Sequence, residues 1–61
     1  MEFWSVGTEF VVIDKWRDSF PGVYTVDARD RDRIYFFIGN WRTWVDADHI
    51  RRPTKLEKAL R

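Results

Sequence analysis

The sequence predicts an all-β fold: a small antiparallel barrel of four to five strands, with a 3₁₀ turn and a short C-terminal helix. Three observations lead to this prediction. Short runs of β-branched and aromatic residues have strand length, turn residues separate these runs, and the chain has only 61 residues. One domain over residues 1–61 is expected, with the barrel core in 6–53 and the helix in 54–61.

The first strand is predicted over residues 8–16, where apolar side chains occupy both faces. A loop over 18–22 follows, in which Pro21 and Gly22 favour a type II turn. The apolar alternation then predicts a second strand over 23–28.

The charged residues of 28–33 alternate in sign and predict a solvated turn. Residues 33–38 have the strongest strand pattern in the chain. Gly39 and Asn40 suit a two-residue type II′ turn, so residues 41–46 should return antiparallel to that strand. By alternation, four aromatic residues are predicted to lie in the core: Phe10, Tyr24, Phe36 and Trp44.

Residues 47–50 predict a single 3₁₀ turn that places Ile50 in the core. Thr54 and Glu57 have the spacing of a capping box, which predicts the start of the C-terminal helix. That helix carries one apolar stripe, made by Leu56 and Leu60, and two turns must dock on the barrel to be stable.

Three segments, VGTEFVVI (6–13), PGVYTV (21–26) and WVDADHIRRP (44–53), together resemble an SH3-like barrel. More narrowly, they resemble the small standalone SH3-like proteins of bacteriophage and mobile-element genomes. The likeness covers core and turn positions, so it implies a fold more directly than a function. It implies an accessory protein that acts on a host macromolecule by occupancy. A likeness to small archaeal chromatin barrels is weaker, because those are rich in lysine and this chain has three.

Composition excludes several classes of function. The chain has no Cys and one His, so disulfides, thiolate zinc sites and other cofactors are not expected. Asp46 and Asp48 near His49 form the only acid–base cluster, but no nucleophile motif or phosphate loop accompanies it, and no enzyme is predicted. No membrane span or signal peptide is expected, and the cytoplasm is the default location.

Eleven aromatic residues, four of them Trp, are more than a domain of this size can hide. Exposed Trp beside Arg is typical of protein-binding surfaces, so a protein partner is the first interpretation, for a monomer or a small homo-oligomer. The predicted contact residues lie mostly at strand ends and in loops: Trp4, Trp16, Arg17, Tyr35, Trp41 and Arg42.

Nucleic acid is the second interpretation, because aromatic rings stack on bases and cations neutralise phosphates. Residues 1–32 carry a net charge of −3 and residues 33–61 a net charge of +4. The positive charge gathers from Arg51 to Arg61. The residues predicted for this role are Arg33, Arg51, Arg52, Lys55 and Lys58.

Overall fold

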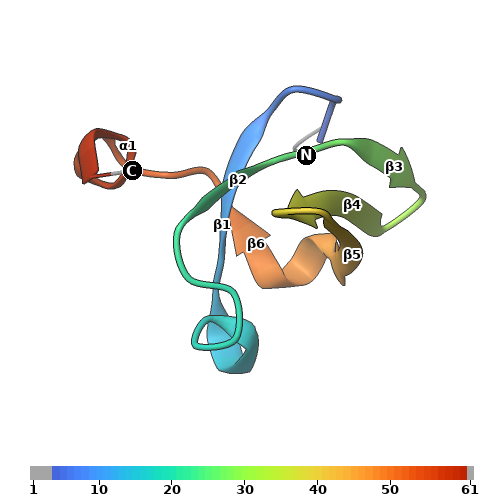
Figure 1. The fold of residues 1–61 in the computed structure, drawn as a ribbon, viewed down its shortest axis with the longest axis horizontal. Coiled ribbons are helices and arrows are strands. Elements are labelled where there is room, and N and C mark those ends of the chain that lie inside the picture. Colours follow the sequence, from blue (N-terminus) through green and yellow to red (C-terminus); the bar gives the residue numbers. More distant parts are fainter. Residues whose placement is uncertain (1–3, 61) are drawn as a thin grey trace.

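The computed structural model describes residues 4–60, without the side chain of Leu60, and contains two antiparallel three-stranded sheets that share one core (Figure 1). The first sheet has the order β2-β1-β6: β2 (Val23–Thr25), β1 (Glu9–Val12) and β6 (Ile50–Arg51). The second has the order β3-β4-β5: β3 (Ala28–Asp30), β4 (Arg33–Ile38) and β5 (Trp41–Asp46). The described strands do not close into the barrel that the sequence predicts.

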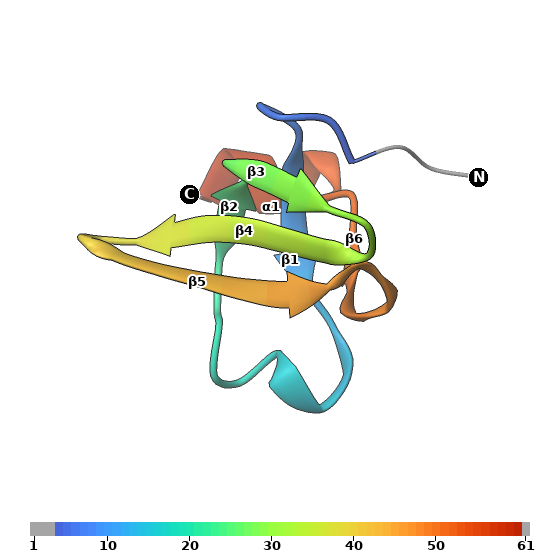
Figure 2. The ribbon, with the colours of Figure 1, turned by 90° about the vertical axis from the view of Figure 1, so that its right-hand side faces the viewer.

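The hairpin of β4 and β5 has the predicted bounds and turn. Ile38 pairs with Trp41 across the two-residue turn. Gly39 has φ of +61°, whereas Asn40 is not among the residues with positive φ, as a type II′ turn requires. Figure 2 shows this hairpin extending to the left beyond the rest of the molecule.

The predicted strand over 23–28 is correct for 23–25 but wrong in extent, because the chain changes sheets within it. The backbone N–H of Val26 donates to the carbonyl of Thr8, beside β1, whereas the next N–H, of Asp27, donates to the carbonyl of Tyr35 in β4. β2 and β3 are therefore separate strands in different sheets. Alternation missed the break because the inward face keeps its period of two through the bend.

The solvated turn predicted over 28–33 is also wrong in extent. Residues 28–30 form β3, and the turn is confined to Arg31 and Asp32, with Arg31 at φ of +58°. Charged side chains are compatible with a strand here because β3 lies at the edge of its sheet and two of its three residues are exposed.

The first strand ends at Val12, four residues before its predicted end. Asp14 has φ of +63°, a left-handed conformation that Asp tolerates and that no strand continues through. The 3₁₀ helix η1 (Asp14–Trp16) follows, and its Trp16 is exposed.

The core lies between the two sheets and contains the aromatic residues predicted for it, with one exception. Phe10 and Phe36 are fully buried and meet edge to face, with 5.1 Å between ring centroids. Tyr24 is half-buried against the same cluster, 4.9 Å from Phe36. Trp44 is 44% exposed, so its prediction as a core residue is wrong.

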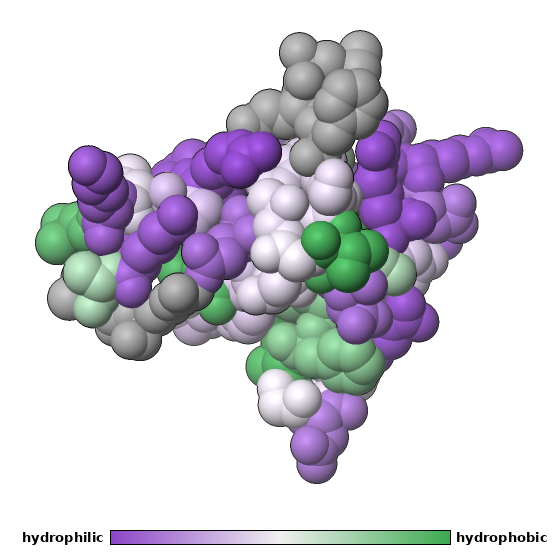
Figure 3. Space-filling model, turned by 90° about the horizontal axis from the view of Figure 1, so that it is seen from above, coloured by the Kyte–Doolittle hydropathy of each residue, from purple (hydrophilic) through white to green (hydrophobic). Residues whose placement is uncertain are grey.

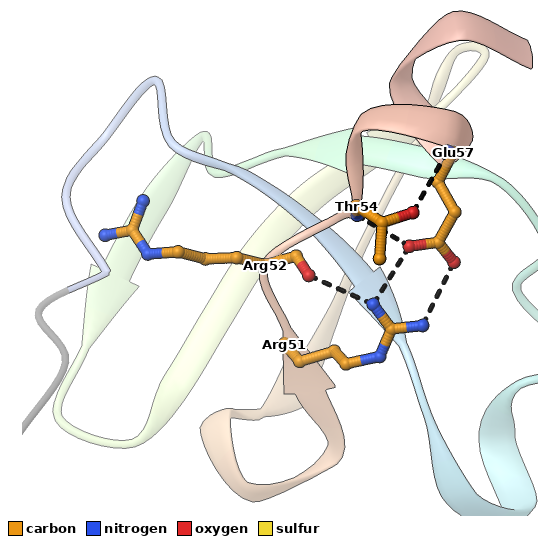
Figure 4. A network of polar contacts seen from close by, with 4 residues as sticks. All are labelled: Arg51, Arg52, Thr54 and Glu57. Atoms are coloured by element: carbon orange, nitrogen blue, oxygen red, sulfur yellow. Dashed lines mark hydrogen bonds and ion pairs between the residues drawn. The ribbon is translucent and has the colours of Figure 1, made fainter.

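The C-terminal segment confirms the predicted turn and cap. The 3₁₀ helix η2 (Ala47–His49) leads into Ile50, which is buried. Helix α1 (Lys55–Leu60) begins after Thr54, whose Oγ1 accepts the N–H of Glu57 at 3.2 Å, while Oε1 of Glu57 accepts the N–H of Thr54 at 2.8 Å (Figure 4). This reciprocal pair is the capping box that the sequence predicts.

An ion pair fixes α1 to the strand before it. Both terminal guanidinium nitrogens of Arg51 donate to the carboxylate of Glu57, at 2.9 and 3.0 Å (Figure 4). Leu56, on the predicted apolar stripe, is 69% exposed, and the side chain of Leu60 lies outside the described part. The contacts that attach α1 here are therefore polar rather than apolar. Helix α1 has six residues, and no helix in the described part of the chain is long and apolar enough to cross a membrane.

The attachment of α1 should depend on pH. Hydrogen bonds from Arg51, and then from the backbone of Thr54, lower the pKa of Glu57 from 4.5 to about 2. A lowered carboxyl pKa stabilises the folded arrangement above the unfolded value, and this stabilisation is lost as the pH falls through the folded one. We expect the amide signals of α1 to shift between pH 4.5 and about 2, as followed by NMR. Glu57→Gln, which keeps a capping side chain, should lack this transition; an unchanged titration would contradict the assignment.

Candidate binding surface

The outward side of the β4–β5 hairpin gathers arginine and aromatic side chains on one strand face. Successive strand residues point to opposite sides of a sheet, and Ile34 and Phe36 take the inner side, where both are fully buried. Their neighbours along β4, and the residues that pair with these in β5, face solvent. We name the arginine and aromatic residues of this surface the arginine–aromatic face: Arg33, Tyr35, Phe37, Arg42 and Trp44, with Asp46 beside them opposite Arg33.

Two cation–π contacts order this face. The guanidinium carbon of Arg33 lies 4.5 Å from the ring centroid of Trp44, and that of Arg42 lies 4.6 Å from the ring centroid of Tyr35. Tyr35 and Trp44 also pair directly across the two strands. Each such contact at an exposed site contributes about 0.5–1 kcal/mol. Rings and guanidinium groups are thus held in place before any partner arrives.

The charge of the arginine–aromatic face is nearly balanced. Arg42 forms an ion pair with Asp27, 3.4 Å from nitrogen to oxygen. Asp46 stands directly opposite Arg33 in the strand register. Both cations therefore have a nearby carboxylate, which weakens the attraction of this face for a phosphate backbone.

A hollow of about 270 Å³ borders β5 and shares Trp44 with the arginine–aromatic face. Its walls come from the loop after β1, from β5 and from η2: Trp16, Phe20, Thr43, Trp44, Val45, Asp46 and His49. The imidazole Nδ1 of His49 lies 3.3 Å from a carboxylate oxygen of Asp14, 35 residues away in the chain. The partner of His49 is therefore Asp14, and not the Asp46 or Asp48 of the cluster seen in the sequence.

A larger hollow, of about 470 Å³, also borders the loop after β1. Val11, Val23 and the ion pair of Arg51 with Glu57 form part of its wall. The charges of that pair satisfy each other, whereas Arg17 and Asp18, which also line the hollow, have largely exposed side chains.

Trp4 was predicted to contact a partner, and this is wrong. It is 5% exposed and packs edge to face on Phe10, with centroids 6.3 Å apart. The guanidinium of Arg52 lies 5.8 Å from the ring centroid of Trp4. Trp4 therefore belongs to the core cluster, a role that sequence position alone does not indicate.

Of the other predicted contact residues, Tyr35 is half-buried and the rest are exposed, and the set is not gathered in one place. Trp16 is 40% exposed and borders the hollow beside β5, with the Arg17 side chain next to it in solvent. Trp41 is 70% exposed at the tip of the hairpin. Only Tyr35 and Arg42 of that set join the arginine–aromatic face, together with Arg33 from the nucleic-acid set. Phe37 and Trp44 complete it.

The basic segment from Arg51 onward is partly neutralised. Arg51 pairs with Glu57, and Nζ of Lys58 lies 3.8 Å from a carboxylate oxygen of Glu9. Lys55 and Arg52 are exposed, and Arg61 lies outside the described residues. The contacts of this segment mainly attach α1 to the sheet.

Apolar exposure is not confined to the arginine–aromatic face. Figure 3, from above, shows hydrophobic side chains in several small groups between hydrophilic ones, one of them over α1 at the left. Single exposed apolar residues of this kind are normal for a small domain. A binding surface is therefore better identified by ordered contacts than by hydrophobicity alone.

Comparison of the chain with models of protein families, with curated proteins and with solved structures found no match. Within residues 4–60, no three side chains of His, Asp or Glu come together as a metal site would require. The geometry of the arginine–aromatic face is therefore the main guide to function.

Proposed function

We propose that this chain is a non-enzymatic binding module of SH3-like architecture that binds a protein partner through the arginine–aromatic face. The resemblance of the sequence to small SH3-like proteins of phage genomes supports a host protein as the partner. In this proposal the chain is an accessory protein of phage type, and it modulates the host protein in the cytoplasm by occupying its surface. The order of elements supports this architecture: two small antiparallel sheets, a segment that passes from one to the other, and a 3₁₀ turn before the last strand.

One observation carries the proposal: two arginine–aromatic stacks lie side by side on a single strand face. Trp, Tyr and Arg dominate the binding energy of protein interfaces, where they are most effective in a desolvated centre. Rigid, already stacked side chains lose little conformational entropy on binding. Balanced charge on the face favours a protein over a polyanion.

Trp44→Ala should remove partner binding without unfolding the protein. We expect a protein captured from a bacterial extract by the wild type to be lost, with affinity reduced about 30-fold or more, the effect of a 2 kcal/mol hot spot. Leu56→Ala on α1 changes a residue that is more exposed and should retain the protein. Capture that is identical for both variants, each checked by circular dichroism, would place the binding surface elsewhere.

Nucleic acid remains the competing function because the same rings could stack on bases. A 20-base-pair duplex and a mixed-sequence single strand, titrated by Trp fluorescence, separate the two. We expect no binding at physiological salt. Binding that is tight at low salt and weakens steeply as salt rises would show release of counterions and replace the protein partner by DNA or RNA.

A further inference from the structure

β5 presents the longest free strand edge of the described residues. It stands at the border of its sheet, with β4 on one side and no strand on the other. It has six residues, whereas the other border strands, β2, β3 and β6, have two or three. A free edge carries unpaired N–H and C=O groups and is a template for pairing with another chain.

The register shows which backbone groups are free. Ala47, directly after β5, donates its N–H to the carbonyl of Asp32 at 2.8 Å, toward β4. The backbone N–H and C=O groups of successive strand residues point to opposite edges of the strand, so Thr43 and Val45 also direct these groups to β4. Arg42, Trp44 and Asp46 direct theirs away from the sheet.

These three residues are self-complementary. If a second β5 pairs antiparallel with the first so that Trp44 lies opposite Trp44, then Arg42 of each copy lies opposite Asp46 of the other. All six facing residues then exchange hydrogen bonds in the pattern of an antiparallel ladder. The two-fold axis repeats the Arg42–Asp46 pair, and opposite charges in cross-strand pairs stabilise a sheet.

We infer that two copies of this chain join through β5 into a dimer with one continuous six-stranded sheet. Other registers are disfavoured, because they place Arg42 opposite Arg42, place Asp46 opposite Asp46 or shorten the ladder. The chosen register also sets exposed Trp41 opposite Ala47 of the second copy, near the end of the hollow that Trp16 borders. The contact thus covers apolar rings as well as backbone. It does not depend on the proposed partner.

Charge reversal at the edge tests this dimer. Sedimentation equilibrium should give the wild type twice the chain mass of 7.5 kDa. Arg42→Asp and Asp46→Arg each place like charges opposite each other twice, and each should weaken the dimer about ten-fold or more. The double variant R42D/D46R restores both pairs and should recover the dimer. Arg29→Asp, the same charge change on β3 at the other border, should leave it intact.

The pattern of the four variants decides between interfaces. Singles that dissociate and a double variant that reassociates support pairing through β5. A wild type that is still monomeric at about 1 mM overturns the inference, because the dissociation constant of the dimer would then exceed 1 mM, which corresponds to less than about 4 kcal/mol of binding free energy. A dimer that persists in both single variants overturns it as well, because its interface then lies elsewhere. Circular dichroism confirms that each variant is folded.

Discussion

Replacing Phe36 with alanine is expected to unfold most of the protein at room temperature. Its ring is fully buried and contacts three other rings, those of Phe10, Phe20 and Tyr24, with centroids 4.9 to 5.7 Å away. Truncation of a buried Phe to Ala typically costs about 3–5 kcal/mol. A core in a domain below 70 residues rarely supplies more than about 3–5 kcal/mol in total. The loss is therefore about as large as the stability itself.

Urea unfolding followed by far-ultraviolet circular dichroism measures this effect. Phe37→Ala is the matched control, because Phe37 is the next residue of β4 and is 48% exposed on the opposite face. It should lose less than about 1 kcal/mol. Equal destabilisation by the two variants would contradict the assignment of the inner and outer faces of β4.

Much of the fold could be predicted because local chemistry specifies it. Gly39 and Asn40 determine the turn between β4 and β5. Thr54 and Glu57 determine the start of α1. In each case, residues close together in the chain satisfy one another, so no knowledge of distant contacts is needed.

The rest depends on contacts between distant segments. The break between β2 and β3 is made by hydrogen bonds of Val26 and Asp27 to residues in two different sheets. Asp14, after the end of β1, has a positive φ, and its carboxylate contacts the imidazole of His49, 35 residues away in the chain. The apolar alternation at both places is still typical of a strand, so the local sequence does not indicate either contact.

The candidate site could be predicted in part. Alternation in residues 33–38 puts Tyr35 and Phe37 opposite the buried face, and their pairing partners in β5 follow from the two-residue turn. Applying the same alternation to β5 would have placed Trp44 outside, next to Tyr35. Aromatic character, on which the prediction of Trp44 in the core rests, is a weaker guide to burial in a chain with more rings than its core can hold.

Trp4→Ala is expected to destabilise the fold by about 3 kcal/mol or more, although Trp4 lies near the chain start. The ring is 5% exposed and packs on Phe10, so its removal leaves a cavity at the side of the core. Trp41→Ala removes the same side chain at a position that is 70% exposed, and it should change stability by no more than about 0.5 kcal/mol.

The two Trp variants separate packing from contact. Their unfolding free energies come from urea titrations at a protein concentration below that of any self-association, because Trp41 lies beside the proposed dimer contact. A Trp4 variant as stable as the wild type would mean that Trp4 does not pack in the core and is free to contact a partner. A large loss in the Trp41 variant would instead mean that the hairpin tip packs on the body of the molecule. The expected difference of more than 2 kcal/mol between chemically identical substitutions follows from burial alone.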